Sequence, residues 1–146
     1  MVPPTRPTPR GERIRSVLLV DDEEDLLLSL KDVFESAMPG LIVRIASSGE
    51  EALRILEAGE RPEIIVSDYR MPGMNGIEFL REAEKLVPGV PRLMITAYAS
   101  PELAVAAARE GGAVMLIAKP FDIGYFVDVV RVATEPSEAT VRDALA

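Results

Sequence analysis

Neither cysteine nor histidine occurs among the 146 residues of the chain. Without cysteine there is no disulfide, no thiolate metal site and no cysteine nucleophile, which is typical of a cytoplasmic location. Without histidine the chain can be neither a histidine kinase nor a histidine phosphotransfer protein. Imidazole bases and imidazole metal ligands are excluded for the same reason.

Long hydrophobic runs are also missing. No apolar stretch approaches the roughly 20 residues that a membrane-spanning helix needs, and the first residues do not resemble a secretory signal. We therefore expect no membrane partner. Apolar residues still make up 48% of the chain, which is enough for the core of a single domain.

Positive charge is scarce, because the chain has 16 lysines and arginines against 24 acidic residues, a formal charge of −8. Residues 1–13 hold three arginines and one glutamate, a charge of +2, which leaves −10 for the remainder. The strong negative charge of the residues after position 13 argues against nucleic-acid binding. It would accept a metal cation well.

The chain divides into three parts by composition. Residues 1–13 contain four prolines and almost no apolar side chains, which predicts a disordered leader. A single folded domain is expected over residues 14–134. Residues 135–146 are too few for a domain and are interpreted as a tail or the start of a linker.

Short apolar segments alternate with helical patterns through the folded part. We predict an α/β fold, in which a doubly wound five-stranded parallel sheet of flavodoxin-like order 2-1-3-4-5 carries helices on both faces. The predicted buried strands are Ser16–Val20, Leu41–Ala46, Ile64–Ser67, Arg92–Thr96 and Val114–Ala118, and the predicted helices are 24–37, 49–58, 76–86, 101–110 and 122–134.

Helix starts and apolar stripes support these assignments. Capping boxes are predicted for Ser48 with Glu51 and for Asn75 with Glu78, and Ser100 with Pro101 predicts a third helix start. Two sets of residues recur at helical spacing and predict faces that pack on the sheet: Leu26, Leu30, Val33 and Ala37, and then Phe126, Val129, Val130 and Ala133.

Polar residues stand at the ends of four predicted strands: Asp21 and Asp22, Asp68, Thr96, and Lys119. Each alone has an ordinary structural explanation as a cap, turn or surface residue. Together they converge on the sheet edge where this fold class binds ligands. Three carboxylates there call for a cation, and oxygen ligands suit Mg²⁺ or Mn²⁺. Asp68 could then act as a carboxylate nucleophile that forms an aspartyl phosphate.

With these residues the chain resembles the receiver domains of two-component response regulators over roughly residues 14–134. Four strings carry the resemblance: VLLVDDEED (17–25), VSDYRMPGMNG (66–76), MITAYA (94–99) and AKPF (118–121). The resemblance implies a phosphoprotein in which a sensor histidine kinase or a phosphotransfer protein supplies a phosphoryl group. A downstream output partner or domain and a phosphorylation-dependent homodimer are further implied partners.

The resemblance also assigns roles to single residues. Asp68 would accept the phosphoryl group, while Thr96 and Lys119 would contact it. Asp22 would bind Mg²⁺ directly, Asp21 mainly through water, and the carbonyl of Arg70 would complete the ligands. A cis bond is expected between Lys119 and Pro120. Catalysis would be limited to the chain's own phosphorylation and dephosphorylation.

Two neighbouring positions depart from the family pattern. Leu116 stands where the family often has a tyrosine or phenylalanine, and Met115 replaces the acidic residue that commonly precedes it. This puts the aromatic switch in question and leaves open a pseudo-receiver that signals without phosphate. A haloacid-dehalogenase phosphatase is disfavoured, because such enzymes place a second Asp where this chain has Arg70. A dinucleotide-binding domain is disfavoured because no G-x-G-x-x-G follows the first strand.

Overall fold

Residues 15–134 are described by the computed structural model. The leader expected over 1–13 and the tail expected over 135–146 lie outside these residues. Strands and helices alternate strictly in the described part. The elements are β1 (Ser16–Val20), α1 (Glu24–Ala37), β2 (Ile42–Ala46), α2 (Gly49–Glu57), β3 (Ile64–Asp68), α3 (Gly76–Leu86), β4 (Arg92–Thr96), α4 (Pro101–Gly111), β5 (Met115–Ala118) and α5 (Ile123–Thr134).

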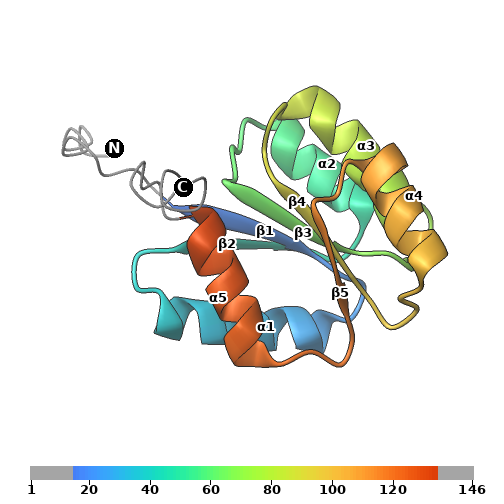
Figure 1. Cartoon of the computed structure of the whole chain (residues 1–146). Helices are drawn as coiled ribbons and strands as arrows, with labels where there is room; N and C mark the ends of the chain where they lie inside the picture. The colour runs from blue at the N-terminus through green and yellow to red at the C-terminus, as the bar shows by residue number, and fades with distance from the viewer. Residues whose placement is uncertain (1–14, 135–146) are drawn as a thin grey trace, which may run out of the picture.

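The five strands form one parallel sheet in the order β2-β1-β3-β4-β5, so the predicted fold class is confirmed. Figure 1 shows α1 and α5 on one face of the sheet, with α2, α3 and α4 on the other. The chain reverses its direction across the sheet between β1 and β3. In open sheets of this kind, ligands bind beyond the carboxyl ends of the strands at such a reversal.

Two hydrophobic clusters lie on the two faces, because successive side chains of a strand point to opposite sides. Leu19 packs in the cluster that holds Phe34 of α1 and Phe126 of α5, whereas Leu18 packs in the cluster that holds Phe79 of α3. All five residues of β3 are buried. This central strand therefore gives a rigid base to the side chain at its end.

The caps mostly form as predicted. Asn75 and Glu78 make a full capping box, and the Ser100 hydroxyl accepts the N–H of Leu103. Ser48 accepts the N–H of Glu51, but the Glu51 carboxylate accepts from the N–H of Ser47 instead of Ser48. The reciprocal half of that predicted box is therefore shifted by one residue.

The apolar stripe predicted for α1 is partly wrong. Leu27, Leu30 and Phe34 are buried, whereas Ala37 is exposed and Leu26 is half-buried. The buried face of α1 is the one that carries Phe34. The Phe34 ring packs edge to face on Phe126, with 5.4 Å between the ring centroids. In α5, Phe126 and Val130 are buried as predicted, and Val127 joins them.

The outermost strand β5 is less buried than predicted. Met115 and Ala118 are exposed, and Val114 lies outside the strand with 72% of its surface accessible. Only β4 pairs with β5 among the strands of residues 15–134, so an edge strand keeps one side open.

No helix in this part of the chain has the length and apolarity to span a bilayer.

Candidate functional site

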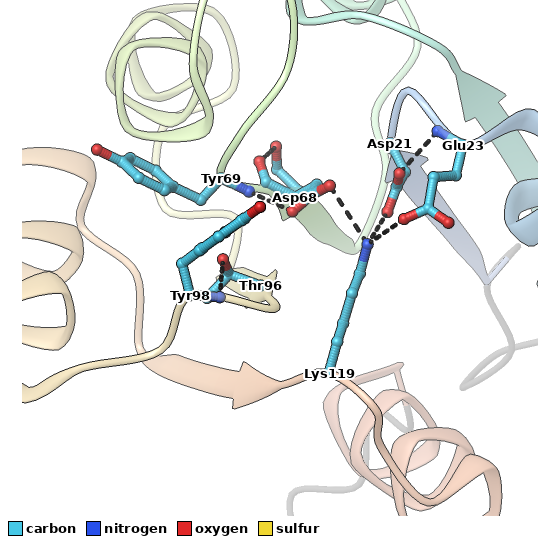
Figure 2. A network of polar contacts seen from close by, with 8 residues as sticks. Asp21, Glu23, Asp68, Tyr69, Thr96, Tyr98 and Lys119 are labelled. Atoms are coloured by element: carbon cyan, nitrogen blue, oxygen red, sulfur yellow. Dashed lines mark hydrogen bonds and ion pairs between the residues drawn. The ribbon is translucent and has the colours of Figure 1, made fainter.

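Four of the residues predicted from sequence meet at the carboxyl edge of the sheet (Figure 2). Asp21 directly follows β1, Asp68 is the last residue of β3, Thr96 is the last of β4, and Lys119 directly follows β5. Asp68, Asp21 and Thr96 are all buried. The Lys119–Pro120 bond is cis, as the family resemblance implies.

The Lys119 ammonium joins three carboxylates. Its Nζ donates to Oδ2 of Asp21 at 2.8 Å, to Oε1 of Glu23 at 3.2 Å and to Oδ2 of Asp68 at 3.3 Å. One positive charge therefore faces three negative charges, and this part of the site carries excess negative charge. That imbalance is the electrostatic condition in which a cation would bind favourably.

Sequence reasoning did not single out Glu23, which reaches Lys119 from just before α1. Its carboxylate is 64% exposed, and its backbone N–H donates to Oδ1 of Asp21 at 2.8 Å. Oxygens of Glu23, Asp21 and Asp68 all lie within 4.8 Å of one another. The only sequence feature that pointed to Glu23 was the acidic run 21–25. That run does not indicate which of its side chains is directed toward the ends of the strands.

The Asp68 carboxyl group has an unusually high proton affinity. Burial, with repulsion from Asp21 as the second cause, raises its pKa to about 6, although Lys119 and the N–H of Tyr69 act in the opposite direction. Burial lowers the pKa of Lys119, but its contacts with Asp21 and then Asp68 outweigh burial and the pKa is raised. Lys119 is therefore charged at neutral pH, and the Asp68 carboxylate is basic for its type.

Thr96 is held in place by the turn that follows β4. Its Oγ1 accepts the backbone N–H of Tyr98 at 3.0 Å, which leaves the hydroxyl proton to be donated elsewhere. The Tyr98 ring is 56% exposed and carries the Arg70 guanidinium over its face, 4.2 Å from the ring centroid. The loops after β3 and β4 are thereby linked across the edge of the sheet.

Asp22 and Arg70, both predicted to hold a metal, are not among the residues that the Lys119 ammonium contacts. Asp22 is exposed and makes no contact with Lys119 among the hydrogen bonds of residues 15–134. It lines a surface cavity of about 520 Å³ together with Tyr69, Arg70 and Asn75. The structure thus brings Asp21 and Asp68 together, whereas Asp22 and Arg70 share the lining of this cavity.

The loop from β3 to α3 depends on a close backbone approach. A Cβ on Gly76 would lie 2.2 Å from the carbonyl oxygen of Asp68, so only glycine fits there. The N–H of Gly76 donates to the carbonyl of Tyr69 at 2.8 Å, and the Glu50 carboxylate of α2 accepts the N–H of Met74 at 3.1 Å. These contacts shape the segment that contains Arg70.

Leu116, at the position where the family often has an aromatic residue, is half-buried in the middle of β5. It packs against the cluster that holds Leu103 and Ala107 of α4. Its neighbour Met115 is exposed. The side chain thus packs on the face of the sheet that α4 covers, and its part in signalling stays a prediction.

A family model described as the response regulator receiver domain matches residues 17–131. The chain belongs to this family. The resemblance inferred from the four sequence strings is therefore confirmed, and the receiver domain occupies the folded part of the chain. Receiver domains of this family are signalling domains of two-component systems.

Two proteins with similar sequences differ in how much of their length the receiver domain covers. The receiver domain is 38% identical over 120 residues to the C4-dicarboxylate transport transcriptional regulatory protein DctD of Rhizobium meliloti (strain 1021), which is 82% of this chain but 25% of that protein. The chain thus spans about a quarter of that relative. It is 33% identical over 115 residues to the sporulation initiation phosphotransferase F of Bacillus subtilis (strain 168), covering 79% of this chain and 90% of the relative.

One solved structure of similar fold contains a phosphorylated residue. It is a response regulator protein from Burkholderia pseudomallei with a phosphorylated aspartic acid, calcium ion and citrate. The TM-score is 0.71 at 28% identity, covering 90% of this receiver domain and 73% of the other chain. That protein carries a phosphorylated aspartic acid.

Proposed function

We propose that the receiver domain accepts one phosphoryl group on Asp68, with Mg²⁺ or Mn²⁺ bound beside it, and that phosphorylation changes an output surface. The observation that carries the proposal is the buried Asp68 carboxylate at the end of the central strand, 3.3 Å from the Lys119 ammonium. The phosphorylated aspartic acid of the Burkholderia pseudomallei relative supports it.

The transfer forms one bond and breaks one bond. An oxygen of the Asp68 carboxylate attacks phosphorus, and the bond from phosphorus to the donor nitrogen breaks, so that the donor imidazole keeps the electron pair. Lys119 pairs with the transferred group, and the Thr96 hydroxyl donates to it. A raised pKa makes the Asp68 carboxylate a better nucleophile, and above pH 6 it is mostly ionised. Hydrolysis later returns the free carboxylate.

The residues present fit a hard divalent cation. The available ligands are oxygens, and three carboxylates surround a single ammonium group. Asp22, Asp68 and the carbonyl of Arg70 would hold the ion, and Asp21 would act through water. Bound there, the cation supplies positive charge beside the phosphoryl oxygens.

The donor imidazole does not come from residues 1–146, which contain no histidine. We infer that a histidine kinase or phosphotransfer protein docks over the cavity of about 380 Å³ beside Lys119. Its lining is mostly apolar and includes Leu26, Phe121 and Ile123. An apolar rim next to a charged centre suits a protein partner that must exclude water during the transfer. A downstream output partner and a homodimer remain further proposals.

Phosphorylation in vitro tests the proposal directly. Incubation with acetyl phosphate and Mg²⁺ should add one phosphoryl group per chain, observed by intact-mass spectrometry. Removal of the metal with EDTA should stop the reaction, because the excess negative charge would then repel the anionic donor. No mass increase with either Mg²⁺ or Mn²⁺ would favour the pseudo-receiver that signals without phosphate.

Asp22→Ala is expected to weaken Mg²⁺ binding more than Asp21→Ala does. A direct ligand contributes more than a group that acts through water, for which losses of about 10- to 100-fold are typical. Calorimetric titration of Mg²⁺ into each variant measures the difference. Asp25→Ala, in the same acidic run, serves as the control and should retain the wild-type affinity. Equal losses at Asp21 and Asp22 would contradict this division of roles.

A further inference from the structure

Glu23 lies where the carboxylates around Lys119 meet the cavity of about 380 Å³. Glu23 and Lys119 are the two charged residues of that lining, and the others are apolar: Leu26, Ala97, Pro120, Phe121 and Ile123. Figure 2 shows the Glu23 carboxylate turned toward the Lys119 ammonium, as the Asp21 carboxylate is. A donor that reaches Asp68 through this cavity therefore passes Glu23.

The Lys119 ammonium is matched by three carboxylates. An ammonium group has three N–H donors, and oxygens of Asp21, Glu23 and Asp68 accept from it at 2.8, 3.2 and 3.3 Å. An additional oxygen, such as one of an incoming phosphoryl group, must displace one of these contacts.

Glu23 is the carboxylate that gives way at the lowest cost. Asp21 is buried, and its other oxygen is held by the backbone N–H of Glu23 at 2.8 Å. Asp68 is the group that receives the phosphoryl group in the proposed transfer. The Glu23 carboxylate is 64% exposed, so water can replace its contact with Lys119 at little cost in free energy. Arrival of the phosphoryl group therefore releases Glu23 toward the cavity.

We propose that Glu23 determines the preferred class of phosphoryl donor, by favouring a phosphorylated imidazole over an anionic acyl phosphate. The inference rests on the proposed transfer to Asp68. A phosphorylated imidazole in its cationic form carries an N–H on the nitrogen that does not bind phosphorus. The released Glu23 carboxylate accepts this N–H in a charge-assisted hydrogen bond.

This contact assists the transfer without taking up a proton. The bond from the Asp68 oxygen to phosphorus forms, and the bond from phosphorus to nitrogen breaks. The ring keeps the electron pair and its N–H, so the cationic ring leaves as neutral imidazole. Because the Glu23 carboxylate stabilises the cationic form, it favours the state of the ring that is the better leaving group.

An acyl phosphate experiences the opposite effect. It has no N–H to donate to Glu23, and its leaving group departs as a carboxylate anion. The Glu23 carboxylate repels this anion and also competes with the phosphoryl oxygens for Lys119. Glu23 therefore slows transfer from an acyl phosphate and assists transfer from an imidazole.

Glu23→Gln tests the inference, because it keeps the length of the side chain and removes its charge. The initial rate of phosphorylation is measured by intact-mass spectrometry with Mg²⁺ and either N-phosphoimidazole or acetyl phosphate. We expect a slower reaction with N-phosphoimidazole and a faster one with acetyl phosphate. The ratio of the two rates should fall about ten-fold, the size of effect typical of a hydrogen bond to a charged group.

Glu24→Gln is the matched control. Glu24 is the next residue, is exposed, and is not one of the three carboxylates that contact Lys119. Its substitution removes the same charge from the same acidic run. A general loss of repulsion would speed both donors alike, since both are anionic overall, so the ratio should stay at the wild-type value.

The possible results separate this inference from the proposed function. A ratio that is unchanged in Glu23→Gln, or that falls equally in Glu24→Gln, would overturn the role of Glu23 and leave Asp68 as the acceptor. Phosphorylation of the wild type by acetyl phosphate alone would have the same meaning. Phosphorylation of the wild type by neither donor would contradict the proposed function, and the inference with it.

Discussion

Asp68→Asn is expected to take up no phosphoryl group from acetyl phosphate and Mg²⁺, under conditions that phosphorylate the wild-type chain completely. The amide preserves the shape of the side chain and can still accept the N–H of Tyr69, which donates to Oδ1 of Asp68 at 2.8 Å. It has no anionic oxygen to attack phosphorus. Intact-mass spectrometry, followed by peptide mapping of the wild type, measures the loss and locates the modified residue.

The control for this substitution is Asp32→Asn, which changes an exposed carboxylate on α1. It should be phosphorylated as the wild type is. Unchanged phosphorylation of Asp68→Asn would contradict the assignment of the acceptor. Phosphorylation lost in both variants would instead indicate damage that is not specific to Asp68.

Sequence reasoning located most of the site, because parallel strands carry their carboxyl ends to one edge. Asp68, Thr96 and Lys119 were identified from strand ends alone, and these positions are fixed by the sheet. Glu23 and Asp22 could not be distinguished in the same way. They leave the strand through a turn, and the direction of each side chain there depends on backbone angles that periodicity does not report.

The fold class was predictable for a related reason, since uniform apolar strands between helical patterns admit few arrangements. The differences arise where tertiary packing decides. Ala37 has the spacing of a buried residue but is exposed, because Phe34 sets the contact of α1 with α5. Met115 is as apolar as a core residue but lies on an edge strand. The residues next to Met115 in the sequence do not indicate which strand will lie at the edge of the sheet.

Asp68→Asn is also expected to stabilise the metal-free domain at neutral pH. The pKa of this carboxyl group is raised from 3.8 to about 6 in the folded chain, first by burial and then by Asp21. Between these two pH values the folded state therefore holds more protons than the unfolded state, and the free energy of unfolding falls as pH rises. Above pH 6 the ionised carboxylate costs about 2–3 kcal/mol of stability.

Replacing Asp68 by asparagine removes that cost, so the gain should be present at pH 7.5 and mostly absent at pH 4.5. Urea denaturation in EDTA at both pH values measures it, with Asp32→Asn as the control that shows no pH-dependent gain. Mg²⁺ should reduce the gain, because a bound cation stabilises the ionised wild-type carboxylate and not the amide. A variant less stable than the wild type at pH 7.5 without metal would show that the contact with Lys119 outweighs burial. Without a metal ion, the ionised Asp68 carboxylate lowers the stability of the domain, and nearby cations compensate for its negative charge. Such a site suits a phosphoacceptor. The aspartyl phosphate carries more negative charge than the carboxylate, and the same cations stabilise it.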